Sequence, residues 1–292
     1  MRHRILPLAL VLCLAAGPDA ASQLTVTDDY GRTIRVPASP RRIVSLAPSI
    51  TESLFAIGAG PALVGVTEYC TYPPAAARVP RVGGLTSPNL EAILALQPDL
   101  VLMSMEGNRQ EDFTQFERFK IPVVVSNPRT LGGIFRSLRQ LGDLTGHPRE
   151  ARALVDSLER RLTVVRTSIA GKPVGTLLFV SLQPPMVAGG KTFLNEILEA
   201  AGARNLAAGA TGTYPALSRE AILAADPEAL FVTADLLPAG TTLTDLFPEW
   251  KILRAVRGGR IYRIDPDIVS RPGPRAVDAI EQISSLLHTG SP

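Results

Sequence analysis

The chain has 292 residues, of which 46% are hydrophobic and 20% are charged, and this composition excludes disordered and fibrous proteins. Its 30 basic and 27 acidic residues are scattered, without basic runs, so nucleic acid is not an expected partner. With only three histidines and no HExxH motif, no metal site is predicted. The length suits two medium domains.

The N-terminal segment, residues 1–22, has the three-part plan of a secretory signal peptide. Arg2 and Arg4 precede an apolar run over residues 5–16, and small residues follow. The run is shorter than the roughly 20 apolar residues that a membrane-spanning helix needs. We therefore expect cleavage near Ser22 and a soluble protein exported to the periplasm.

The two cysteines raise separate questions. Cys13 lies in the leader and suggests a lipoprotein, but Leu12 precedes it, where a lipidation site takes a small residue. Removal of the leader leaves Cys70 alone, so no intrachain disulfide is predicted even in an oxidising compartment. The role of Cys70 stays open.

Residues 23–146 are predicted to form an N-terminal α/β lobe. A short buried strand over residues 42–46 precedes a helix from about Ile50 to Ile57 that ends at Gly58. A helix capped by Asn89, a proline stop and a hydrophobic strand follow over residues 89–104.

The segment 147–172 is predicted to be one long connecting helix. Apolar residues recur there at spacings of three and four, and charged residues occupy the other face. A flexible linker is instead rich in glycine and serine. A single helix between two lobes limits how far they close on each other.

Residues 173–292 repeat the pattern of the first half. A strand over 177–182 precedes a helix from about Phe193 to Ala201, stopped by Gly202, and Glu52 matches Glu196 at an offset of 144. Residues 89–104 also align with 218–233, where six of the sixteen positions are identical (Glu, Ala, Ile, Leu, Ala and Pro). Alternating strands and helices indicate parallel sheets. The predicted fold is α/β: two Rossmann-like lobes, each a mainly parallel sheet with flanking helices, joined by one long α-helix.

Catalytic machinery is not visible in the sequence. Gly-Gly-Lys-Thr at 189–192 resembles the end of a phosphate-binding loop, but Pro185 stands where the first glycine belongs. Neither a G-x-S-x-G elbow nor a G-x-G-x-x-G loop is present. His147 and His288 lie at the start of the connecting helix and near the tail, away from any predicted cleft. We expect a binding protein and not an enzyme.

The candidate binding residues lie in loops after strands, where open α/β sheets bind ligands. Aromatic and apolar side chains with a few polar anchors suit a large amphipathic ligand. The candidates are Ser45, Pro48, Ser49, Tyr69, Cys70, Tyr72, Leu85, Thr86, Gln183, Met186, Tyr214, Asp267 and Arg271.

Four segments together resemble the helical-backbone class of periplasmic substrate-binding proteins, which serve ABC importers of vitamin B12, haem and iron siderophores. They are residues 41–52 (RRIVSLAPSITE), 64–74 (VGVTEYCTYPP), 89–101 (NLEAILALQPDLV) and 271–275 (RPGPR). The resemblance covers nearly the whole mature chain in order. The Tyr-x-x-Tyr-Pro-Pro loop and the Ser-Arg-Glu helix start at 218–220 favour the vitamin B12 branch.

By position, the resemblance implies a cleft lined by Tyr69, Leu85, Tyr214, Asp267 and Arg271. Leu85 and Tyr214 stand where the best-known vitamin B12 binder has tryptophans, which leaves the ligand open. Haem binders of the class often use a tyrosine or histidine as an axial iron ligand, a role open to Tyr69 or Tyr214, so haem or a ferric siderophore is the alternative. The spacing Asp-x-x-x-Arg also suits an i,i+4 surface pair on a helix, but Pro266 and Pro272 disfavour a regular helix, so we expect a loop to present Asp267 and Arg271.

The resemblance also implies partners. The class delivers its ligand to a permease and its ATPase, and a monomer is expected. Glu91 and Glu220 match glutamates that meet permease arginines in the class. No resident cofactor is expected, since the corrinoid or haem is the cargo.

Overall fold

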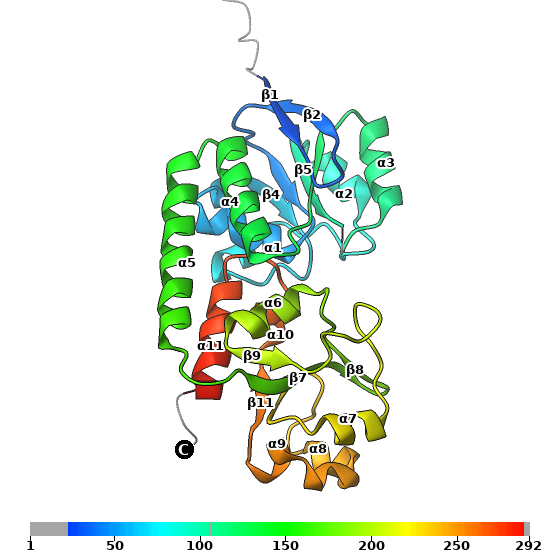
Figure 1. The fold of residues 1–292 in the computed structure, drawn as a ribbon. Coiled ribbons are helices and arrows are strands. Elements are labelled where there is room, and N and C mark those ends of the chain that lie inside the picture. Colours follow the sequence, from blue (N-terminus) through cyan, green and yellow to red (C-terminus); the bar gives the residue numbers. More distant parts are fainter. Residues whose placement is uncertain (1–22, 106, 289–292) are drawn as a thin grey trace, which may run out of the picture.

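The computed structural model describes residues 23–105 and 107–288. The predicted signal peptide, its cleavage site and Cys13 lie outside the described residues. Two lobes stack one above the other, and a long helix runs along one side of them (Figure 1). The N-terminal lobe extends from β1 to α4, and the C-terminal lobe from β7 to α11.

The N-terminal lobe is built on a parallel sheet in the order β4-β3-β5-β6. Its strands are β3 (Ile43–Ser45), β4 (Leu63–Val66), β5 (Leu100–Ser104) and β6 (Val123–Ser126). Its helices are α1 (Pro48–Ala56), η1 (Gly60–Ala62), η2 (Pro74–Arg78), α2 (Leu90–Ala95), α3 (Gln110–Arg118) and α4 (Leu131–Thr145). An antiparallel hairpin that the sequence analysis missed, β1 (Gln23–Thr27) and β2 (Thr33–Pro37), precedes the sheet.

The C-terminal lobe repeats this strand order. Parallel strands β7 (Val174–Leu182), β9 (Ala203–Asn205), β10 (Ala229–Thr233) and β11 (Ile261–Ile264) pair as β9-β7-β10-β11. A short strand β8 (Pro185–Val187) runs antiparallel to the end of β7. The helices are α6 (Phe193–Ala200), α7 (Arg219–Ala225), α8 (Leu243–Leu246), η3 (Pro248–Ile252), α9 (Arg254–Arg257), α10 (Pro266–Val269) and α11 (Ala276–His288).

The predicted repeat is confirmed at its helix ends as well. The Asn89 side chain accepts a hydrogen bond from the Ala92 amide at 3.0 Å, and Ser218 accepts one from Ala221 at 3.1 Å. Helices α1 and α6 are followed by Gly58 and Gly202, whose φ angles of +86° and +83° suit glycine. Short-range signals therefore place the same unit in both lobes.

The connecting helix is α5, Pro148–Ser168, shorter than the segment 147–172 that the sequence predicted. The helix begins at Pro148, since proline lacks the amide hydrogen that would have no partner in the first turn. It ends at Ser168, because the backbone of Ile169 is extended. At about 1.5 Å per residue the helix is about 30 Å long. Although α5 is long, its exposed face is charged, and no helix among the described residues could cross a membrane.

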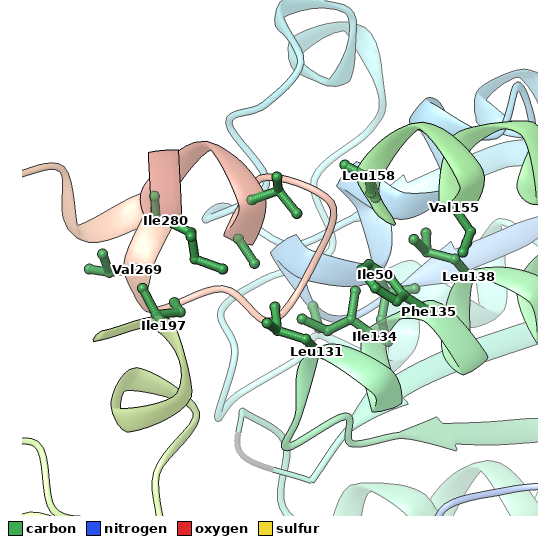
Figure 2. Close-up of a cluster of buried hydrophobic side chains, with 14 of the residues drawn as sticks. Ile50, Leu131, Ile134, Phe135, Leu138, Val155, Leu158, Ile197, Val269 and Ile280 are labelled. Carbon is green, nitrogen blue, oxygen red and sulfur yellow. The ribbon is translucent and has the colours of Figure 1, made fainter. Parts of the chain in front are cut away.

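One hydrophobic core runs through both lobes. Figure 2 shows side chains of α1, α4 and α5 continuing into side chains of α6, α10 and α11. The labelled members are Ile50, Leu131, Ile134, Phe135, Leu138, Val155, Leu158, Ile197, Val269 and Ile280. Because apolar side chains are buried across the boundary, opening the lobes would expose them to water.

Candidate ligand-binding site

A cavity of about 680 Å³ lies at the carboxyl ends of the C-terminal strands. Its wall includes one residue from the N-terminal lobe, Arg129, on the loop between β6 and α4. The lining residues are Arg129, Val180, Ser181, Met186, Lys191, Thr192, Phe193, Leu194, Thr213, Tyr214, Val269, Ser270 and Pro272. The cavity is thus mixed in character, with apolar side chains beside two cationic ones.

Two of the predicted site residues, Met186 and Tyr214, lie in this wall, and 43% of Tyr214 is exposed. Backbone hydrogen bonds hold its loop against β8 and the turn after it. Val187 donates to the Pro215 carbonyl at 3.1 Å, and Gly189 donates to the Thr213 carbonyl at 2.9 Å. The bonds on either side of Tyr214 fix its backbone while its ring stays accessible.

Tyr69 and Tyr72 lie on the opposite, N-terminal lobe, in the loop after β4, and they are 54% and 44% exposed. Arg81 anchors this loop by donating to the carbonyls of Thr67 at 2.8 Å and Cys70 at 2.9 Å. Arg81 therefore fixes the base of the loop, while about half of each tyrosine residue stays exposed.

Cys70 and Ser45 belonged to the wider set of candidate ligand contacts, and this expectation is wrong. Both are fully buried. The Cys70 sulfur lies 3.2 Å from the hydroxyls of Thr51 and Thr67, and Thr51 donates to Ser45 at 2.9 Å. These small polar groups satisfy one another beneath the Tyr69 loop, so Cys70 serves packing.

Leu85 is half-buried and lies on a loop that Asn108 holds in place. The Asn108 amide donates to the carbonyls of Leu85 at 2.8 Å and Leu46 at 3.0 Å, and its oxygen accepts from the Ser104 amide at 2.8 Å. Asn108 thereby ties the Leu85 loop to the ends of β3 and β5. Asn108 was not predicted from the sequence, although an asparagine four residues after the end of a strand was a usable signal.

Asp267 does not lie in a loop, which corrects one expectation. Pro266 occupies the first turn of α10, where proline is tolerated, and the Asp265 side chain caps the helix by accepting from the Asp267 amide at 2.8 Å. Arg271 follows the helix, and its guanidinium lies 2.6 Å from the Asp267 carboxylate as an i,i+4 ion pair. The flanking prolines therefore bracket a single helical turn.

Arg271 and Arg275 share a buried carboxylate from the other lobe, a feature that the sequence analysis missed. Glu52 on α1 accepts from Arg271 Nη1 at 2.9 Å and from Arg275 Nη2 and Nε at 2.7 Å each. The Glu52 side chain is only 2% exposed. Hydrogen bonding to this carboxylate raises the pKa of Arg275, so the guanidinium stays charged. A buried charge is tolerated because it is paired in this way.

Contacts of Thr71 and Tyr72 bring the loop that carries Tyr69 to the same lobe boundary as Asp267 and Arg271. The Thr71 hydroxyl, two residues after Tyr69, lies 3.5 Å from both the Asp267 carboxylate and the Arg271 guanidinium. The Arg275 guanidinium stacks over the Tyr72 ring at 4.2 Å. Tyr214 shares its cavity with the residues on either side of Arg271, and Leu85 lies on the N-terminal lobe.

Glu91 and Glu220 are exposed and lie in the first turns of α2 and α7, one on each lobe (Figure 1). Hydrogen bonds from its own amide and from the Ser218 hydroxyl lower the pKa of Glu220. Both carboxylates are favoured by the positive end of the helix dipole.

Residues 23–105 and 107–288 contain no group of three or more acidic, histidine or cysteine residues arranged to hold a metal ion.

Comparison with known proteins places this geometry in a family. The periplasmic binding protein family matches residues 43–268. A vitamin B12-binding protein of Pectobacterium carotovorum is 33% identical over 87% of this chain and 91% of its own. An ABC transporter substrate-binding lipoprotein of Bacillus subtilis is 30% identical over 91% of this chain and 85% of its own.

A crystal structure of a periplasmic haem-binding protein from Pseudomonas aeruginosa has a TM-score of 0.78 and 29% identity, covering 87% of this chain and 94% of that one. The two-lobed α/β fold is thereby confirmed. These relatives are exported substrate-binding proteins and not enzymes, as the sequence analysis expected. The chain belongs to the periplasmic binding protein family.

Proposed function

We propose that the protein captures a corrinoid, the ring system of vitamin B12, between its two lobes and delivers it to an ABC permease. The observation that carries the proposal is the exposed aromatic surface on both lobes, Tyr69 on one and Tyr214 on the other. A large flat ring with a polar periphery suits aromatic faces flanked by a few charged groups. The relative named for vitamin B12 supports this ligand.

Asp267 and Arg271 are the proposed polar contacts at the edge of the ring. Arg271 uses one guanidinium nitrogen for Glu52 and the other for Asp267, so both side chains are already oriented before a ligand arrives. An arginine side chain has five N–H donors, so the contacts to Glu52 and Asp267 leave further donors of Arg271 for amide oxygens of a ligand. Orientation in advance lowers the entropy that binding costs.

Haem is the second candidate ligand, and one observation favours it. Tyr69 and Tyr214 are 54% and 43% exposed, and a tyrosine oxygen is a known axial ligand of haem iron. The similarity to a haem-binding structure at 29% identity supports the same possibility. In this case the iron belongs to the cargo and not to a resident cofactor.

Spectroscopy of the exported form, residues 23–292, distinguishes the candidates. The protein is incubated separately with cyanocobalamin and haemin, desalted, and measured by visible absorbance and calorimetry. We expect cyanocobalamin to remain bound, unaltered and at one equivalent. Retention of haemin alone would support the second candidate, and retention of neither would contradict both.

A further inference from the structure

Two glutamates reach across the lobe boundary in opposite directions. Glu52 on α1 of the N-terminal lobe binds Arg271 and Arg275 of the C-terminal lobe. Glu196 on α6 of the C-terminal lobe accepts a hydrogen bond from the Leu131 amide of the N-terminal lobe at 2.7 Å. Both contacts thus join segments from different sheets.

The two glutamates are equivalent in the internal repeat. They stand 144 positions apart, each on the helix after the first strand of its sheet, β3 or β7. Each contacts the start of the last helix in the other lobe. Leu131 is the first residue of α4, and Arg275 directly precedes α11. The contacts are therefore related by the same pseudosymmetry as the lobes.

Both contacts hold loops that line the cavity. Arg271 lies between Ser270 and Pro272, which are in the cavity wall, and Leu131 follows two residues after Arg129, the wall residue from the N-terminal lobe. We propose that Glu52 and Glu196 are positioning residues that fix these two wall loops from the opposite lobe and so set the width of the binding cleft. The effect on affinity depends on the proposed function, since it requires a ligand in this cleft.

The two contacts differ in what they demand chemically. Glu196 uses one oxygen to satisfy a helix-start amide that has no partner within its own helix, and its charge favours the helix dipole. A glutamine supplies the same acceptor. Glu52 accepts arginine donors with both oxygens. A glutamine there turns an NH₂ group toward a guanidinium and removes the charge that balances two arginines.

The test therefore compares Glu52→Gln, Glu196→Ala and Glu196→Gln with the unchanged protein. We expect cyanocobalamin to bind about tenfold more weakly to Glu52→Gln and Glu196→Ala, equivalent to about 1.4 kcal/mol. Glu196→Gln is expected to bind within about twofold of the unchanged protein by the same relation. Unchanged affinity in both Glu52→Gln and Glu196→Ala would overturn the proposal.

Two controls separate positioning from lost stability. Glu199→Ala removes an exposed carboxylate from the same helix α6 and should change nothing. Leu158→Ala creates a cavity in the core face of α5 and lowers the melting temperature, yet should leave affinity intact at 10 °C. An equal loss of affinity in Leu158→Ala would assign the glutamate effects to stability and overturn positioning.

Hydrogen exchange of the ligand-free protein keeps this test independent of the ligand. In Glu196→Ala the Leu131 amide should exchange at least tenfold faster, with protection restored in Glu196→Gln. In Glu52→Gln the Ala276 amide, which donates at 3.1 Å to the carbonyl of Gly273 between the two arginines, should exchange faster. Unchanged exchange at both amides would overturn the proposal, whereas retention of neither candidate ligand by the unchanged protein would contradict the proposed function alone.

Discussion

Tyr69 and Tyr214 distinguish the two candidate ligands at the scale of single residues. Replacing either by phenylalanine keeps the ring and removes the oxygen. If a corrinoid stacks on these rings, Tyr69→Phe and Tyr214→Phe should bind it within about threefold, since the ring face supplies the contact. If one tyrosine ligates haem iron, its phenylalanine variant should lose the haem spectrum.

The control for both variants is Tyr30→Phe, because Tyr30 is similarly exposed, at 41%, but lies in the β1–β2 turn. Its spectrum and affinity with either ligand should equal those of the unchanged protein. A loss of corrinoid affinity in Tyr214→Phe beyond tenfold would contradict ring stacking as the main contact.

Asp226 provides a pH prediction at the same scale. Its carboxylate accepts from the Arg254 amide at 2.9 Å and from Arg254 Nε at 2.8 Å, and the backbone hydrogen bond lowers the pKa of Asp226. A carboxyl with a lowered folded-state pKa adds stability above its unfolded pKa of about 3.9, and this stability is lost as the pH falls through the folded value. Asp226→Asn should therefore melt lower at pH 7, with a difference that disappears in acid. A difference independent of pH would contradict this linkage.

Helix caps are the features to test at the scale of elements. Asn89 and Ser218 cap equivalent helices in the two lobes, and replacing an N-cap by alanine costs about 1 kcal/mol of folding free energy. We expect Asn89→Ala and Ser218→Ala to lower unfolding free energy by this amount each in urea titrations. Asn89→Asp, which retains an acceptor, should stay near the unchanged value. Unchanged unfolding free energy in both alanine variants would show that the caps do not stabilise the protein.

Helices α2 and α7 also carry the proposed permease contacts. Changing Glu91 and Glu220 together to alanine should leave ligand affinity intact and abolish transport in vesicles with the cognate permease and ATPase. Charge pairs at such an interface mainly steer and orient the partners. The matched control is Glu111→Ala with Glu150→Ala, since these glutamates occupy first turns of α3 and α5 and are also exposed. Normal transport by the Glu91 and Glu220 double variant would leave them only a capping role.

At the scale of the whole molecule, the structure favours limited lobe closure. Helix α5 joins the lobes, and the hydrophobic core continues from it through α6 and α11. Glu52 and Glu196 each form hydrogen bonds with the opposite lobe. Moving the lobes far apart would expose apolar core and break a buried ion pair. We expect X-ray scattering to give nearly the same radius of gyration with and without ligand. A compaction of several ångströms on binding would contradict this rigidity.

The amino-acid sequence by itself determined the repeated βα units, their caps and glycine stops, and the α5 helix, because each signal lies within a few residues of the element it specifies. The resemblance then indicated the fold and the candidate residues, whose ligand contacts stay predictions. It did not reveal that Asp267 lies in a helical turn, nor that Cys70 is buried beneath the Tyr69 loop.

Only the tertiary structure decided the lobe boundary. Arg271 and Arg275 lie 219 and 223 positions from Glu52, and Leu131 lies 65 from Glu196. No periodicity or cap links residues at such separations, because their contact depends on how the two sheets pack around a shared core. Burial makes the Glu52 pairs necessary, since a charge removed from water needs a partner, and here both partners belong to the other lobe.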